Sequence, residues 1–96
     1  MKRYRKSRKG YPDGVLLVAD NRGESIDRYT VLYTPDPGTG YFPYVGMSGS
    51  PFHPQGVCQY GEMPNRLSVW GTGDRVIEFT DLPEDCQQVV KQDLAR

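Results

Sequence analysis

The chain is poor in the residue types that build disulfide scaffolds, membrane anchors and multi-histidine metal sites. It has two cysteines and one histidine in 96 residues, and two cysteines are too few for the disulfide framework of a small secreted domain. The only apolar run behind the charged N-terminus, residues 15–19, is shorter than the roughly 7–15 residues of a signal peptide. We therefore expect a cytoplasmic protein with no export signal and no membrane span.

The charge is unevenly distributed, although the formal net charge is zero. Six of the twelve basic residues fall in the first nine positions, and the other six stand against all twelve acidic residues, which leaves the body at −6. A basic segment attracts nucleic acid or an acidic protein surface, whereas an acidic body repels phosphates and can compete with them for a basic groove. The basic side chains of the N-terminal segment are Lys2, Arg3, Arg5, Lys6, Arg8 and Lys9.

The length indicates one domain. Residues 1–10 combine like charges with no apolar periodicity, so we expect a disordered basic arm followed by one globular α+β domain over residues 11–96. The predicted fold is an antiparallel, partly barrel-like sheet of about five strands with one C-terminal helix. Strands are predicted over residues 15–19, 28–34, 41–47, 67–70 and 76–79, and the helix over residues 82–95.

Local patterns support these elements. Tyr29, Val31 and Tyr33 alternate with more polar residues, which is typical of a strand with one buried face. Pro43 lacks a ladder donor and favours an edge position or a bulge. At the C-terminus, Asp81 and Glu84 have the spacing of a helix capping box. The apolar stripe of the predicted helix consists of Leu82, Cys86, Val89, Val90 and Leu94.

Residues 48–65 are rich in glycine and proline and contain Pro51-Phe52-His53-Pro54-Gln55-Gly56. They predict one long braced loop, and loops of more than about 12–15 residues in compact domains tend to be functional or disordered. Residues 71–74, Gly-Thr-Gly-Asp, lack the lysine and the following helix of a phosphate-binding loop, so we interpret them as a hairpin turn.

Few residues suggest catalysis. His53 could act as a base for Cys58 or share a metal with it, but zinc normally needs three or four ligands, and Cys86 on the helical stripe fits a small buried hydrophobe. The acidic residues are scattered, so paired-carboxylate catalysis has no support. We predict no catalytic residue, no metal and no cofactor. A small enzyme or metal-bound protein that uses His53, Cys58 and Glu62 remains the alternative.

Eleven aromatic residues, seven of them tyrosine, are many for a chain of this length. Tyrosine offers a rigid contact area with a polar tip, which favours protein interfaces and base stacking; the competing interpretation is that these rings fill a core poor in aliphatic residues. The predicted binding residues are Asp27, Tyr41, Tyr44, Phe52, His53, Gln55, Tyr60, Glu62 and Asp74.

Several stretches resemble a set of small uncharacterised proteins encoded by bacteria, plasmids and phages. The resemblance implies a mobile-element setting and no particular chemistry. Tyr60 stands where such proteins have a second histidine, so no two-histidine metal site carries over. The matching residues are 27–31, Tyr44, 46–48, 51–56, Gln59, Gly61, Glu62, Phe79, 81–83, Asp85 and Cys86.

Two hypotheses follow from the residues and the resemblance. The first is a non-enzymatic interaction protein of a phage or mobile element, such as an anti-CRISPR inhibitor, whose acidic, tyrosine-rich surface binds a host protein or ribonucleoprotein complex. The alternative is a nucleic-acid-binding or regulatory protein that uses the basic arm. The sequence leaves the partner and the oligomeric state open.

Overall fold

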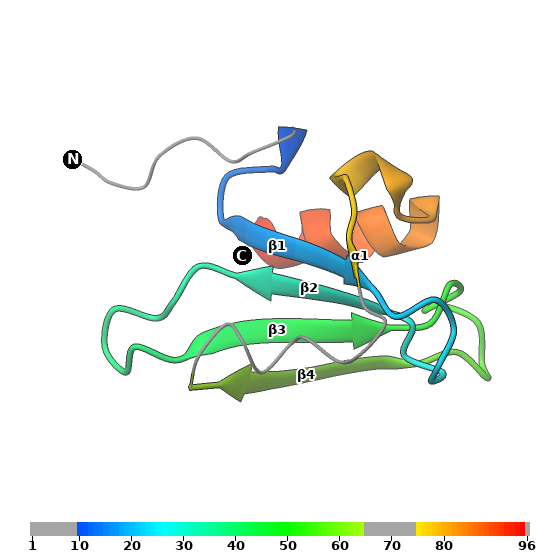
Figure 1. Cartoon of the computed structure of the whole chain (residues 1–96), viewed down its shortest axis with the longest axis horizontal. Coiled ribbons are helices and arrows are strands. Elements are labelled where there is room, and N and C mark those ends of the chain that lie inside the picture. Colours follow the sequence, from blue (N-terminus) through cyan, green and yellow to red (C-terminus); the bar gives the residue numbers. More distant parts are fainter. Residues whose placement is uncertain (1–9, 65–74, 96) are drawn as a thin grey trace.

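The structure, a computed structural model, describes residues 10–64 and 75–95. These residues form a five-stranded antiparallel sheet with an α-helix across one face (Figure 1), which confirms the predicted α+β class. The strand order is β4-β3-β2-β1-β5, so the first four strands are neighbours in both sequence and space. The elements are β1 (Val15–Asp20), β2 (Tyr29–Tyr33), β3 (Phe42–Met47), β4 (Cys58–Met63), β5 (Arg75–Val76), a 3₁₀ helix (Phe79–Asp81) and α1 (Glu84–Leu94).

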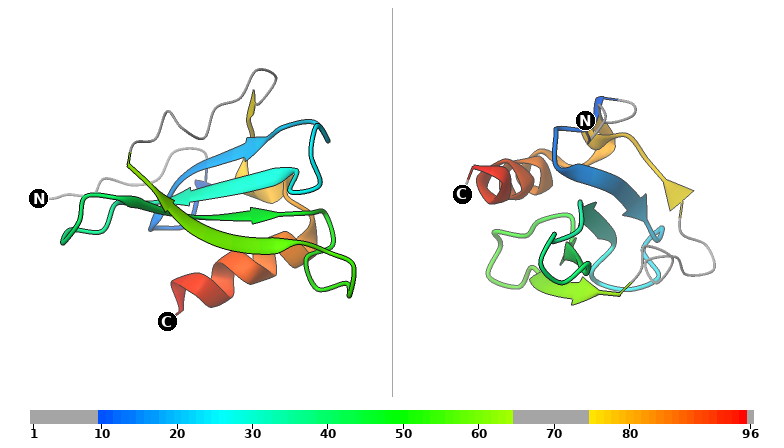
Figure 2. Two further views of the ribbon diagram at one scale, coloured as in Figure 1. Left: turned by 90° about the horizontal axis from the view of Figure 1, so that it is seen from below. Right: turned by 90° about the vertical axis from the view of Figure 1, so that its left-hand side faces the viewer.

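The sheet is open, and the predicted barrel-like closure is wrong. A barrel requires the edge strands of a sheet to pair with each other, but β4 and β5 lie at opposite edges. β5 pairs with β1 through two residues only, Val76 opposite Ala19 and Arg75 opposite Asp20. Figure 2 shows the twisted sheet from two further sides, with α1 beside one face.

Valines from three neighbouring strands form the floor of the core. Val18, Val31 and Val45 are paired directly across β1, β2 and β3, and each is fully buried. Val89 and Val90 of α1 complete this cluster from the helix side. Because burying one such side chain contributes roughly 1.5–3 kcal/mol, this contact between helix and sheet is a major contribution to the stability of the fold.

The strands predicted at residues 15–19, 28–34 and 41–47 correspond to β1, β2 and β3. The continuous apolar run of residues 15–19 predicts burial on both faces or a place under the C-terminal helix, and β1 is buried on both faces. Val18 faces α1, whereas Leu17 lies on the opposite face beside its cross-strand neighbour Leu32, and both leucines are buried.

The helix begins later than predicted, and the predicted capping box is wrong. The Asp81 carboxylate accepts a hydrogen bond from the Glu78 N–H at 3.0 Å, so it stabilises the preceding 3₁₀ helix. Helix α1 starts at Glu84 after Pro83, which provides no side-chain cap. The acidic residues of its first turn still suit the positive end of the helix dipole. Of the predicted stripe, Cys86, Val89 and Val90 are buried within α1, whereas Leu82 is buried just before it.

The predicted long loop contains a strand that the sequence analysis missed. β4 occupies residues 58–63 and pairs with β3 along six residues. As an edge strand it is exposed and polar, so it lacks the apolar alternation that marks an inner strand. Gly61 packs against the Tyr44 ring, because a Cβ at this position would lie 2.7 Å from the Tyr44 hydroxyl.

The last predicted strands also need correction. Residues 67–70 lie outside the described residues. The strand predicted at residues 76–79 exists as β5, but its bounds are wrong: β5 ends at Val76, and Phe79 starts the 3₁₀ helix with its side chain buried in the core. Pro43 belongs to the inner strand β3, yet the β2–β3 ladder ends at Tyr44, so Pro43 has a local edge position on that side.

Tyr11 connects the start of the domain to the middle of the sheet. Its side chain is 5% exposed, and its hydroxyl donates to the Ile77 carbonyl at 2.6 Å and accepts the Val18 N–H at 3.3 Å. These bonds join residue 11, β1 and the segment after β5. In the described residues, no helix combines the length and the apolar character needed to cross a membrane.

We predict that Tyr11→Phe lowers the free energy of unfolding by about 1–2 kcal/mol, because it leaves two buried backbone groups without a partner. Urea denaturation followed by circular dichroism measures this change. Tyr41→Phe is the control, since Tyr41 is exposed, and it should change the stability by less than about 0.5 kcal/mol. Equal effects of the two variants would contradict the role of the Tyr11 hydroxyl.

Candidate functional site

An exposed surface runs along β4, the lowest strand in Figure 1, and the loop of residues 48–57 that joins it to β3 at the right-hand end of the picture. β4 is an edge strand, so its outer side has no strand beside it in the described part of the chain. We call this surface the β4 edge. Its exposed side chains include five predicted binding residues: Phe52, His53, Gln55, Tyr60 and Glu62.

The loop before β4 is held by its own hydrogen bonds. At its base, the Ser48 N–H donates to the Val57 carbonyl, and the Val57 N–H donates to the Ser48 hydroxyl, both at 3.0 Å. Within the loop, the His53 N–H donates to the Ser50 carbonyl at 3.1 Å, and the Gly56 N–H donates to the His53 carbonyl at 2.8 Å. A loop ordered in this way loses little conformational entropy when it binds a partner.

His53 helps to hold the loop. Its Nδ1 accepts the Gln55 N–H at 3.0 Å, which requires an unprotonated Nδ1 and leaves the other ring nitrogen free. The side chain is exposed. No hydrogen bond joins His53 to Cys58, so the structure does not pair the imidazole with a thiol as base and nucleophile.

Phe52 is the largest apolar side chain that the loop presents to solvent. It is 54% exposed, whereas the preceding Pro51 is buried and fixes the loop to the domain. An ordered aromatic side chain that the fold leaves in water is typical of a contact residue in protein interfaces.

Tyr60 links β4 to the helix. Its hydroxyl donates to one oxygen of Asp93 at 2.7 Å, and the Tyr33 hydroxyl donates to the other oxygen at 2.6 Å. Burial of the hydroxyls, and then the Asp93 carboxylate, raises the pKa of Tyr33 and Tyr60 well above the usual range. The rest of the Tyr60 side chain stays available, since the residue is 57% exposed.

The two cysteines are free thiols. Burial raises the pKa of Cys58, although a hydrogen bond with Tyr60 opposes the shift. Burial also raises the pKa of Cys86 to about 11, and its thiol donates to the Ser48 carbonyl at 3.2 Å. Nucleophilic cysteines need the opposite shift. In residues 10–64 and 75–95, no three His, Cys, Asp or Glu side chains are grouped so that they could hold a metal ion.

The remaining predicted binding residues do not join this surface. Tyr41 precedes β3 and therefore lies at the opposite end of the β3–β4 hairpin from the loop, roughly 17 Å away for a six-residue strand. Tyr44 packs on Gly61. Asp27 lies in the β1–β2 connection, where it accepts the Ser25 hydroxyl at 2.6 Å. Asp74 and the six basic arm residues lie outside the described residues.

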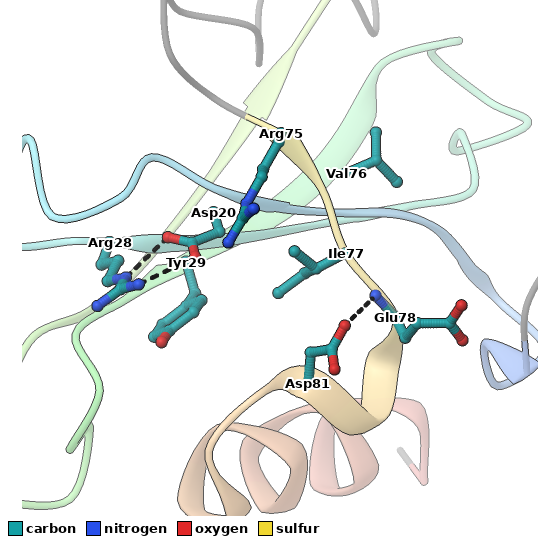
Figure 3. A pocket seen from close by; sticks show the side chains of 8 residues that line it. All are labelled: Asp20, Arg28, Tyr29, Arg75, Val76, Ile77, Glu78 and Asp81. Carbon is teal, nitrogen blue, oxygen red and sulfur yellow. Dashed lines mark hydrogen bonds and ion pairs between the residues drawn. The ribbon is translucent and has the colours of Figure 1, made fainter.

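A polar pocket that the sequence analysis missed lies near the other edge of the sheet (Figure 3). It has a volume of about 610 Å³ and lies between the ends of β1 and β5 and the 3₁₀ helix. Its centre is Asp20, which is 4% exposed. The sequence gives only a weak indication of this pocket, because Asp20 and its partner Arg28 lie on either side of a turn made of ordinary polar residues. The lining residues are Asp20, Arg28, Tyr29, Arg75, Val76, Ile77, Glu78 and Asp81.

Comparisons with known proteins give no match: no family model, no curated protein and no solved structure is similar to this chain. The likeness to small proteins of bacteria, plasmids and phages therefore stays a prediction.

Gly56→Ala should open the loop, because a Cβ at residue 56 would clash with the Ser50 carbonyl oxygen. We expect faster amide hydrogen exchange at His53, Gly56 and Val57 and a stability loss of about 1–3 kcal/mol. Gly49→Ala is the matched control, since a Cβ at residue 49 would lie 4.0 Å from its nearest neighbour, a ring carbon of Tyr29. Unchanged exchange in the Gly56 variant would show that the loop is not constrained in this way.

The Asp93 contacts predict how stability depends on alkaline pH. Unfolded tyrosines ionise near pH 10, whereas folded Tyr33 and Tyr60 remain protonated. The free energy of unfolding should therefore fall as the pH rises above about 10. In Asp93→Asn, ultraviolet titration should show a lower pKa for both phenols. Asp85→Asn removes the same charge at the other end of α1 and should leave the pKa values of Tyr33 and Tyr60 unchanged. Identical titration curves of the two variants would show that Asp93 does not raise these pKa values.

Proposed function

We propose that this protein is a non-enzymatic interaction protein that binds a host protein or ribonucleoprotein complex through the β4 edge. The observation that carries the proposal is the position of Phe52, which is 54% exposed on a loop held by its own hydrogen bonds. Such an aromatic side chain can be buried in a partner at small entropic cost. Tyr60 supplies a second anchor on the same edge.

The charge of the domain favours a basic partner surface. Residues 10–64 and 75–95 contain four basic and eleven acidic side chains, a formal charge of −7. Charge of one sign steers association with the opposite sign and raises the on-rate more than the final affinity. On the edge itself, Glu62 provides an exposed carboxylate. The same charge disfavours direct contact between this domain and nucleic-acid phosphates.

The chemistry of the site also supports binding over catalysis. The pKa of Cys58 is raised, mainly by burial, and Nδ1 of His53 is already engaged by the Gln55 N–H. Neither group has the activation that a nucleophile or a general base requires.

We extend this proposal to the setting implied by the sequence resemblance: an inhibitor of phage or mobile-element origin, of the anti-defence class that includes anti-CRISPR proteins, acting in the cytoplasm. An acidic domain with a rigid aromatic loop can occupy a basic channel that otherwise holds nucleic acid. The competing function is nucleic-acid binding through the arm, for which the six basic residues within the first nine are the supporting observation.

An affinity capture from a nuclease-treated bacterial lysate tests the proposal. The full chain should retain a stoichiometric protein complex, and Phe52→Ala should weaken its affinity at least about tenfold, as expected for an interface hot spot. Ile26→Ala is the matched control, because Ile26 is 66% exposed but lies in the β1–β2 connection. It should leave the affinity unchanged.

A variant lacking residues 2–9 separates the two functions. Full retention of the complex without these residues is expected for an inhibitor that acts through the β4 edge. If capture disappears with nuclease treatment or with the arm, or if Phe52→Ala and Ile26→Ala behave alike, the proposal is wrong.

A further inference from the structure

The polar pocket around Asp20 has a guanidinium group that is fixed in position. The Asp20 carboxylate accepts Nε of Arg28 at 2.7 Å and Nη2 at 3.1 Å. It also accepts the Arg22 backbone N–H at 2.7 Å. With these three bonds the acceptor capacity of the buried carboxylate is largely used, and the hydrogen bonds from Arg28 are the main reason that the pKa of Asp20 is lowered. Arg28 keeps further N–H donors for a ligand, because a guanidinium has five.

Arg75 provides a second guanidinium, which interacts with Asp20 through its charge. Arg75 is directly opposite Asp20 in the β1–β5 pair, and Figure 3 shows its side chain reaching into the pocket toward Asp20. The side chain makes no ion pair or hydrogen bond with any residue in 10–64 or 75–95. It can therefore offer a bidentate donor pair to a ligand.

The hydroxyl of Tyr29 is the third polar group of the pocket. Tyr29 lies opposite Asp20 on the β2 side and lines the pocket, although it is only 9% exposed. Its hydroxyl has no hydrogen-bond partner among the described residues. Figure 3 shows the ring between Arg28 and Asp81. An unpaired hydroxyl on a side chain that is nine-tenths buried is uncommon, because buried polar groups are normally hydrogen-bonded.

We propose that this pocket binds a carboxylate, held by Arg75 and the Tyr29 hydroxyl, with Arg28 as a positioned third donor. The lining carries two guanidinium groups, Arg28 and Arg75, against three carboxylates, a formal charge of −1. Because Asp20 is already paired with Arg28, Arg75 is the cation that a ligand meets, and it matches a ligand with one negative charge. Glu78 and Asp81 on the facing wall repel additional negative charge, so the pocket selects a carboxylate over a phosphate dianion. The carboxylate can belong to a small molecule or to the C-terminus of a peptide.

Nuclear magnetic resonance titration of the ¹⁵N-labelled full chain tests the site at constant ionic strength. The probes are acetate, triglycine, triglycine amide and inorganic phosphate. We expect saturable shifts of the Arg28 and Arg75 Nε–H signals with acetate and triglycine, and weaker binding of phosphate. Stronger binding of triglycine than of both acetate and triglycine amide identifies a peptide C-terminus; stronger binding of acetate identifies a small carboxylate.

Two variants and a control make the test specific. Arg75→Gln should weaken binding about tenfold, because it removes a charge-assisted pair of hydrogen bonds. Tyr29→Phe keeps the ring and should weaken binding about threefold or more through loss of one neutral hydrogen bond. Lys91→Gln, on the exposed side of α1, should bind like the unmodified chain. Linear shifts without saturation, or equal binding by Arg75→Gln and Lys91→Gln, would overturn the proposal.

Discussion

The contact between α1 and the central strands is the constraint on which the rest of the molecule depends. A single eleven-residue helix covers one face of the sheet, and its buried valines meet a row of valines from β1, β2 and β3. A helix of this length spans about 16 Å, so it covers the middle of the sheet and leaves both sheet edges to other groups. Both candidate sites lie at these edges.

The two edges of the sheet, at β5 and at β4, are stabilised by different contacts. At β5, the 3₁₀ helix and the ion pair between Asp20 and Arg28 form a polar pocket beside the core. At β4, the Asp93 carboxylate ties Tyr33 and Tyr60 to the end of α1. The hydrogen bonds of the preceding loop then fix the direction in which Phe52 faces solvent.

Sequence reasoning succeeded where local periodicity reflects burial, and failed where long-range contacts decide the structure. The alternation around Val31 identified β2, and the stripe with Val89 and Val90 identified the helix. β4 was missed because Gly61 reads as a loop residue until its contact with Tyr44 is known. The pocket was missed because the pairing of Asp20 with Arg75 depends on β5, a strand of two residues. The braced character of the loop before β4 was predicted correctly from its prolines and glycines, whereas its length was not.

We propose that the β4 edge, already ordered in the free protein, is the surface that meets the partner. Amide hydrogen–deuterium exchange of the full chain, alone and in the captured complex, tests it most directly. The account predicts slow exchange at Gly56 and Val57 in the free protein, and added protection in the complex that is confined to the loop and β4. Fast exchange of these amides in the free chain, or protection that appears elsewhere and spares β4, would contradict it.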